Sequence, residues 1–253
     1  MNQPSAKRNS APVGAYASSM RLLISVSLVA SLGCASAPAA EEPAPQLVRV
    51  SGSETPTPRA TPSTREYANP PADALGTLPQ GYGVEVGQPA PRVTVQDMDG
   101  EAVELESLWR DQPVLLVFYR GGWCPYCNFQ IHELTEAFEA FRERGVGLAV
   151  ISVDRAEASA RTSASWEIPF PVLSDPDLAA HQAFHVGNEV EPETLDRLRA
   201  MGMDLEHSSG REHHVIAVPA IFLIDREGVV TWAHADLDYR RRPSPEQVLG
   251  AIP

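Results

Sequence analysis

Two cysteines three positions apart are the residues of this chain best suited to chemistry. Cys124 and Cys127 lie in the segment RGGWCPYC, between a continuous apolar run and a stretch with helical periodicity. Helix residues three apart lie on one face about one turn from each other, which is close enough for a disulfide. The spacing therefore indicates a redox-active pair, because a thiolate attacks both disulfides and peroxides.

The junction of strand and helix predicts a different role for each cysteine. Cys124 stands at the expected helix cap, and Pro125 suits the first helical turn. The positive end of the helix should lower the pKa of the Cys124 thiol below its free value of about 8.5, so Cys124 is expected to be the exposed nucleophile. Cys127 continues the apolar stripe of the helix and is expected to be shielded.

A metal site is the main alternative use of a CxxC pair. Zinc would need two further ligands, and the chain has no second CxxC. Its 7 histidines are scattered, and only His213 and His214 are adjacent. An envelope metal carrier that uses Cys124, Cys127 and one of these two histidines stays as a hypothesis. The principal interpretation needs no metal and no cofactor.

The charged residues exclude several classes of protein. Lys7 is the only lysine among the 20 basic residues. Schiff-base and pyridoxal enzymes need a catalytic lysine, and so does the phosphate-binding GxxxxGK[ST] loop, so these classes are excluded. With 33 acidic residues the net charge is −13. A nucleic-acid partner is not expected, because such proteins bind phosphates through clustered Lys and Arg.

Residues 1–33 are expected to be a signal peptide, with Met20 as an alternative start. The apolar run Leu22–Gly33 is too short for a bilayer, which needs about 20 residues, but it has the length of a signal-peptide core. Cys34 follows directly, an arrangement that resembles a bacterial lipoprotein signal and implies a lipid anchor on Cys34. Cleavage near residues 37–40 is the alternative and would remove Cys34. Either way we expect an exported protein of the cell envelope, and lipidation would tether it to the membrane.

Residues 34–80 are expected to form a disordered, extended tether. Nine of the chain's 23 prolines fall within residues 35–80, with Ala, Ser, Thr and Glu between them. Such a segment buries too little apolar surface to offset the entropy of its chain. The folded domain is therefore expected to span residues 81–253.

Strand and helix patterns alternate through residues 81–253 and predict an α/β fold, with a central mixed sheet flanked by helices and an N-terminal hairpin. Residues 187–210 are expected to be an insertion with a helix near Thr194–Met201. The other expected elements are a hairpin of residues 93–95 and 102–105, buried strands at 114–119 and 146–153, helices at 124–144 and 156–166, a strand within 216–225, a strand at 229–234 and a helix at 244–252.

Two segments resemble thioredoxin-fold oxidoreductases. WCPYC is similar to their active site, and its Pro125-Tyr126 middle is that of glutaredoxins. Val218-Pro219 and the apolar run after it resemble the second thioredoxin signature, in which a cis-proline opens a strand that faces the cysteines. The resemblance implies that Pro219 is cis and presents backbone to the substrate beside Cys124; an edge-strand proline is the alternative interpretation.

The larger resemblance covers residues 81–253. It is to the peroxiredoxin-like proteins of the alkyl hydroperoxide reductase and thiol-specific antioxidant family, and it implies a thioredoxin-like fold and an antioxidant role. Asp236–Arg242 resembles a tail stretch of these proteins, and its three adjacent arginines are interpreted as a solvated patch. The motifs that carry the resemblance are Val86–Pro91, Phe118–Arg120, Ile151–Asp154 and Phe170–Pro176.

The chain departs from the pattern of that family at two positions. Counted from Phe118, the peroxide-attacking cysteine of the family matches Cys127, its threonine matches Cys124, and its later arginine falls near Pro219. Arg120 is either a substitute cation beside the sulfur or a solvated strand-end arginine. The buried aspartate of thioredoxins also has no match, because its position is Phe118, which leaves the proton donor unidentified.

These residues are compatible with two further functions besides the metal carrier described above. The first is a thiol oxidoreductase that reduces hydroperoxides: Cys124 attacks, Cys127 closes the disulfide, and a donor thiol protein reopens it. The family alignment implies the inverse order, with Cys127 as attacker. The alternative is a membrane-tethered thiol-disulfide oxidoreductase that acts on envelope proteins. Trp123 and Tyr126 are either an apolar rim for the substrate or ordinary packing.

Overall fold

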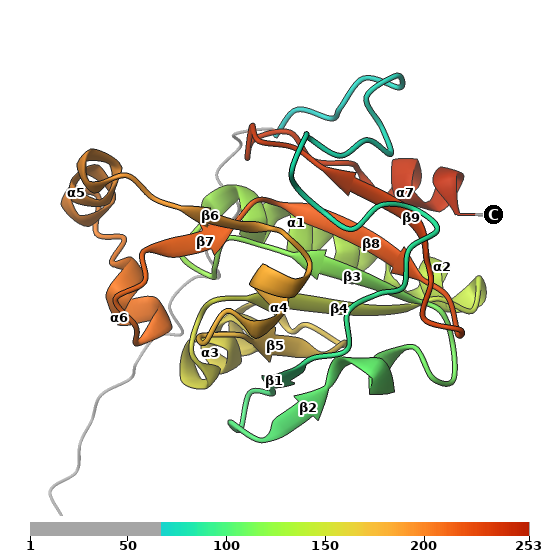
Figure 1. Ribbon diagram of the computed structural model, residues 1–253, viewed down its shortest axis with the longest axis horizontal. Coiled ribbons are helices and arrows are strands. Elements are labelled where there is room, and N and C mark those ends of the chain that lie inside the picture. Colours follow the sequence, from blue (N-terminus) through green and yellow to red (C-terminus); the bar gives the residue numbers. More distant parts are fainter. Residues whose placement is uncertain (1–66, 253) are drawn as a thin grey trace, which may run out of the picture. The chain divides into compact units, whose positions relative to one another are not determined.

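A seven-stranded mixed sheet carries the site, in the strand order β2-β1-β5-β4-β3-β8-β9 (Figure 1). The structure, a computed structural model, describes residues 67–252. A two-stranded sheet joins β6 to β7. The strands are β1 (Thr94–Gln96), β2 (Ala102–Glu104), β3 (Val114–Phe118), β4 (Gly147–Ser152), β5 (Val172–Ser174), β6 (Gly187–Glu189), β7 (Val215–Ala217), β8 (Ala220–Ile224) and β9 (Val230–Ala235).

Strands β3 and β4 are buried along their whole length, as their uninterrupted apolar sequences predict. They run parallel, with Phe118 opposite Ile151, whereas β3 and β8 are antiparallel. Alternate residues of β3 therefore serve opposite faces of the sheet. Leu116 and Phe118 belong to one hydrophobic core, while Leu115 and Val117 belong to a second core that also contains both cysteines.

The helices agree closely with the sequence pattern, with one break. The expected helix at 124–144 is divided at Ala137, which ends α1 and precedes α2 with a φ of −87° and a ψ of 0°. The helices are α1 (Pro125–Glu136), α2 (Phe138–Glu143), α3 (Ala156–Trp166), α4 (Ala179–Ala183), α5 (Pro192–Ala200), α6 (Leu205–Ser209) and α7 (Pro245–Ala251), with a 3-10 turn at Leu105–Leu108. No helix of residues 67–252 combines the length and apolar character that crossing a membrane requires.

Several short elements escaped the sequence pattern. Strands β5 and β6 have three residues each and helices α4 and α6 have five each, so each covers fewer than two periods of its pattern. The expected hairpin, the helix at 156–166 and the thioredoxin-like arrangement of a mixed sheet with flanking helices are confirmed.

The expected domain boundary at residue 81 is wrong, because residues 67–80 pack on the domain. Tyr67 is buried, and its hydroxyl donates to Glu133 on α1. Ala68 N–H donates to Arg240 O at 2.9 Å, and Arg242 N–H donates to Ala68 O at 2.9 Å. These bonds give the segment a fixed path despite its prolines. The signal peptide, Cys34 and the tether up to residue 66 lie outside the described residues.

The expected insertion at 187–210 forms its own small subassembly. It contributes β6, α5 and α6, and β6 pairs with β7, so all four lie together in Figure 1. The apolar residues of this subassembly are Val190, Leu195, Leu198, Leu205 and Ile216. Trp123 packs against this cluster and also against the core that holds the cysteines. The insertion therefore contacts the loop that precedes Cys124.

Candidate active site

The loop between β3 and α1 is drawn tightly onto the end of β4 and onto α3. Gly122 N–H donates to Asp154 Oδ2 at 2.7 Å, and Asn128 Nδ2 donates to Gly122 O at 2.8 Å. A Cβ on Gly122 would lie 2.0 Å from Thr162 Oγ1, and one on Gly121, whose φ is 141°, would lie 2.8 Å from Asp154 Oδ1. Only glycine fits at both positions, and this explains the Gly-Gly before WCPYC.

Both cysteines are reduced and buried, so the expectation of an exposed Cys124 is wrong. The exposed fraction is 1% for Cys124 and 0% for Cys127. Cys124 is the cap of α1 and Pro125 its first residue, as predicted. The Arg120 guanidinium lies 4.0 Å from Cys124 Sγ and stacks 4.2 Å from the Tyr239 ring centre, so neighbouring side chains cover the cap.

The Cys127 sulfur, rather than Cys124, is the stabilised thiolate. It accepts from Arg120 N–H at 3.4 Å and from Arg242 Nη2 at 3.3 Å. Burial alone would raise the pKa of Cys127, but the hydrogen bond from the Cys124 thiol, the Arg242 charge and the Arg120 N–H hold it well below its usual value. Donating that hydrogen bond to Cys127, together with burial, raises the pKa of Cys124 well above its usual value. These contacts outweigh the helix terminus, so the pKa is lowered at Cys127 and raised at Cys124, and the prediction of a lowered pKa at Cys124 is wrong.

Arg242, which sequence reasoning placed wrongly in a solvated patch, is buried against the Cys127 sulfur. Its exposed fraction is 1%, although its neighbour Arg241 is largely exposed. Nη1 donates to Gln130 Oε1 at 2.8 Å, and Nε donates to Tyr239 O at 2.8 Å. Its backbone N–H is held by Ala68, so the N-terminal segment helps to position the guanidinium at the sulfur. A run of three arginines carries no signal that one of them is buried.

Arg120 is buried beside the Cys124 sulfur, which contradicts one of the two interpretations open from sequence, the solvated strand-end arginine. Its exposed fraction is 9%, so the strand-end arginine is not solvated. Its guanidinium lies over the rings of Trp123, at 5.2 Å from the centre, and Tyr239. Tyr239 also meets Tyr126 edge to face, with ring centres 5.4 Å apart. Because Tyr239 is 38% exposed, these aromatic rings both pack the site and form its rim.

The second signature does not take the conformation that the resemblance implies. The described residues contain no cis peptide bond, so the Val218-Pro219 bond is trans. Val218 N–H donates to Val186 O at 2.7 Å, which ties the segment to the residue directly before β6. Pro219 O accepts from Asp236 N–H at 3.3 Å. The prediction of a cis-proline is therefore wrong.

Asp154 is a second residue that sequence reasoning did not assign to the site. It follows β4 and is buried, with an exposed fraction of 1%. Burial, with a smaller contribution from the negative charge of Cys127, raises its pKa to about 7 despite the hydrogen bond from Gly122. The available signal was an acidic residue two positions after a buried, mostly apolar strand.

The histidines do not join the cysteines. His213 Nε2 pairs with Pro176 O at 3.2 Å, and His214 Nε2 pairs with Glu206. Within residues 67–252 no three potential ligands gather in a way that could hold a metal ion. The metal-carrier hypothesis therefore receives no support from the described part of the chain.

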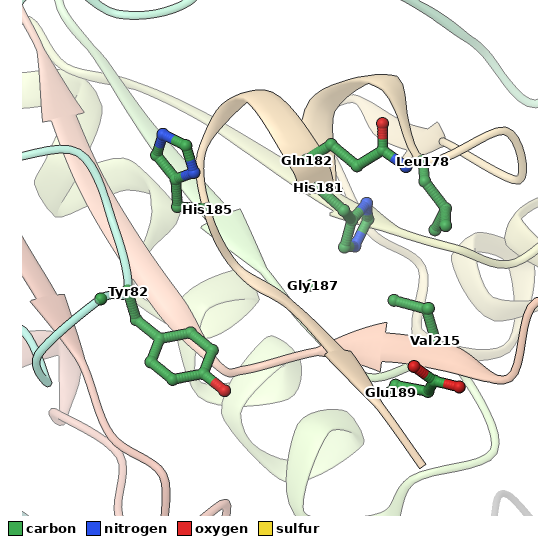
Figure 2. Close-up of a pocket in the computed structure, with 9 residues that line it drawn as sticks. Tyr82, Leu178, His181, Gln182, His185, Gly187, Glu189 and Val215 are labelled. Carbon is green, nitrogen blue, oxygen red and sulfur yellow. The ribbon is translucent and has the colours of Figure 1, made fainter.

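A separate pocket of about 440 Å³ lies beside α4 and β6 (Figure 2). His181 and Gln182 of α4 line it together with Tyr82, and neither cysteine does. The His181 ring packs edge to face on Phe118, which belongs to the core on the other face of the sheet. The pocket is thus not part of the cysteine site.

The geometry defines a thioredoxin-like domain with a buried dithiol at the start of a helix. The chain belongs to the AhpC/TSA family, which matches residues 86–233. Two curated relatives carry names of different activities. Chloroplastic peroxiredoxin Q of Oryza sativa subsp. japonica is 31% identical over 141 residues, which are 49% of this chain and 64% of that protein. Thiol-disulfide oxidoreductase ResA of Bacillus thuringiensis subsp. konkukian is 26% identical over 160 residues, 61% of this chain and 75% of that protein.

The match to the rice relative spans less than two thirds of its length. Among solved structures, reduced Prx3 from Vibrio vulnificus in complex with H2O2 superposes with a TM-score of 0.55 at 17% identity, over 66% of this chain and 98% of that chain. This likeness confirms the fold.

Proposed function

We propose that the chain is a thiol oxidoreductase that reduces hydroperoxides through Cys127 and Cys124. The observation that carries the proposal is the Cys127 sulfur, which accepts hydrogen bonds from Arg242 and from Arg120 N–H inside a buried pocket. A thiolate beside a guanidinium is both the nucleophile and the place where charge on a departing oxygen is stabilised. Arg242 thereby supplies the cation whose family position falls near Pro219.

The chemical steps follow from the two pKa shifts. The Cys127 thiolate attacks the terminal oxygen of the hydroperoxide, the O–O bond breaks, and the alkoxide takes a proton to leave as an alcohol. Cys127 is then a neutral sulfenic acid, so the charge that raised the pKa of Cys124 is gone. Cys124 loses its proton and attacks the Cys127 sulfur; hydroxide leaves with a proton as water, and the disulfide forms. A donor thiol protein returns two electrons.

Burial of the nucleophile favours a small substrate. A protein disulfide has to bring one of its sulfurs into bonding contact with the attacking sulfur, whereas both sulfurs here are covered. A hydroperoxide group needs only a narrow opening. Tyr239, which stacks on Arg120 beside Cys124, is partly exposed and suits contact with an alkyl chain.

Disulfide exchange is the second candidate, and one observation favours it. Cys124 occupies the cap of α1 in a CxxC, at the position of the family's threonine, and the ResA relative carries the name of a thiol-disulfide oxidoreductase. In this version a partner disulfide replaces the peroxide, and the same Cys124–Cys127 disulfide results.

The test follows thiol loss in the reduced full chain with Cys34 replaced by alanine, after one equivalent of hydrogen peroxide. We expect thiol loss orders of magnitude faster than for free cysteine at the same pH, ending in a Cys124–Cys127 disulfide. Cys127→Ser should abolish the fast phase, while Cys124→Ser should keep it and stop at a trappable sulfenic acid. Loss no faster than free cysteine would refute peroxide reduction, and fast reaction with a disulfide instead would favour the second candidate.

We also propose that the chain is exported and tethered to the membrane by a lipid on Cys34. The support is the sequence alone: a short apolar run, directly followed by cysteine, and a proline-rich spacer before the domain. Such a tether would place the dithiol in the cell envelope, where its donor thiol protein would also have to be.

A further inference from the structure

Asp154 is a buried acid built into the cysteine loop. Tyr119 N–H donates to Ile151 O at 3.0 Å, so the ends of β3 and β4 run side by side and the residues after them share one pocket. Asp154 Oδ2 accepts from Gly122 N–H at 2.7 Å, two residues before Cys124. Oδ1 is buried and has no partner in hydrogen-bonding geometry among the described residues. A carboxylate with one unsatisfied oxygen is costly to bury, whereas a carboxylic acid is not.

Three titratable or charged groups face Asp154 from the elements around it. Cys127 on α1 and Tyr119 at the end of β3 would each place a negative charge near it when ionised, and Arg161 on α3 is the cation. Burial raises the pKa of Tyr119 far above its usual value, so it stays neutral. The negative charges of Asp154 and of Cys127 therefore oppose each other in the same buried region.

We propose that Asp154 takes up a proton when the Cys124–Cys127 disulfide is reduced and releases it when the disulfide forms. This inference rests on the proposed function only in requiring that the pair cycles, whether peroxide or disulfide is the oxidant. A donor dithiol gives two electrons and two protons. One proton goes to Cys124, the other goes to Asp154, and Cys127 stays a thiolate. The single negative charge thus moves from Asp154 to Cys127, and the buried region never holds two.

The first test compares the pH dependence of disulfide reduction in the wild type and in Asp154→Asn. Asparagine keeps an oxygen that can accept from Gly122. After correction for the two protons that dithiothreitol itself releases, the equilibrium constant of the protein's own reduction half-reaction changes about 100-fold per pH unit where two protons are taken up per two electrons, and about tenfold where one is taken up. The steeper dependence is expected just below about pH 7, down to the pH at which Asp154 is protonated in the oxidised protein as well. We expect the steeper dependence in the wild type and the shallower one in Asp154→Asn. Asp111→Asn, at an exposed carboxylate, should behave like the wild type.

The second test reads the proton directly. An infrared difference spectrum, reduced minus oxidised, should show the gain of a protonated carboxyl band near neutral pH in the wild type and in Asp111→Asn. The band should be missing in Asp154→Asn. If the wild type shows no such band and the same pH dependence as Asp154→Asn, the proposal is overturned.

That outcome is distinct from a failure of the proposed function. Dithiothreitol reduces the disulfide in both tests, and no peroxide or physiological substrate is needed. A protein that shows the proton uptake but does not react with peroxide would keep Asp154 in its role and refute peroxide reduction alone.

Discussion

Replacing Arg242 by methionine should raise the pKa of Cys127. Arg242 Nη2 lies 3.3 Å from the Cys127 sulfur, and neither side chain reaches solvent. At this separation and an effective dielectric constant of about 20, Coulomb's law gives an attraction of about 5 kcal/mol. The cost of removing the guanidinium from water offsets part of this attraction. We therefore expect a pKa change smaller than the Coulomb energy implies, in the range of about one to three units that opposite charges at about 4–6 Å produce.

The assay is the ultraviolet absorbance of the thiolate in the reduced protein, titrated with pH in the Cys34→Ala background. Methionine is chosen because it keeps most of the side-chain length without charge. We expect a pKa increase of about one to three units for Arg242→Met. Arg241→Met is the matched control, since Arg241 is the adjacent residue, carries the same charge and is largely exposed. It should change the pKa of Cys127 by no more than a few tenths, because surface charges are screened.

Stability gives an independent check of the same electrostatics. A thiol whose pKa is lowered by folding contributes stability that is present above its unfolded pKa of about 8.5 and is lost as pH falls through the folded value. The urea stability of the reduced wild type should therefore rise over this window more steeply than that of Arg242→Met. Equal pKa values for Cys127 in Arg242→Met and Arg241→Met would refute the role assigned to Arg242.

Three further predictions concern other parts of the chain. Gly122→Ala should destabilise the fold by about 1–3 kcal/mol, because its Cβ would lie 2.0 Å from Thr162 Oγ1. Urea melts should show that the double variant with Thr162→Ala recovers part of this stability. Equal stability of Gly122→Ala and the wild type would contradict the packing. Asp154 has a folded pKa of about 7, above its unfolded value of about 4, so its protonation stabilises the folded state. This contribution is complete below about pH 4 and is lost as pH rises through 7. The free energy of unfolding of reduced Asp154→Asn should therefore depend less on pH over this range, and parallel profiles for the variant and the wild type would count against the buried acid. Cys34→Ala should abolish incorporation of a labelled fatty acid into the protein expressed in bacteria, whereas Cys124→Ala should not; label retained by Cys34→Ala would rule out the lipid anchor.

Sequence patterns were sufficient for most of the longer elements and for the placement of the two cysteines at the start of a helix. The apolar run of β3, the CxxC that follows it and the periodicity of α1 are local features, and each depends on residues within one or two turns of one another. The capping position of Cys124, the first-turn Pro125, the hairpin and the helix of the insertion were predicted for the same reason.

The start of the folded domain was not a local property. Composition marked residues 67–80 as part of a spacer, but composition reports only how much surface a segment can bury by itself. Ala68 instead pairs with the backbone of Arg240 and Arg242, and Tyr67 reaches Glu133 on α1. A segment poor in apolar residues is thus ordered by partners far along the chain.

The roles within the pair were decided by tertiary structure. The helix cap is a local reason to favour a Cys124 thiolate, and sequence reasoning followed it. Arg242 lies 115 positions after Cys127 and Asp154 lies 32 after Gly122, yet folding brings each to its partner. In a buried region the nearest charge outweighs a helix terminus, because little solvent remains to screen it. Sequence therefore determined where the two cysteines lie on the helix, and the fold decided which of the two thiols has the lower pKa.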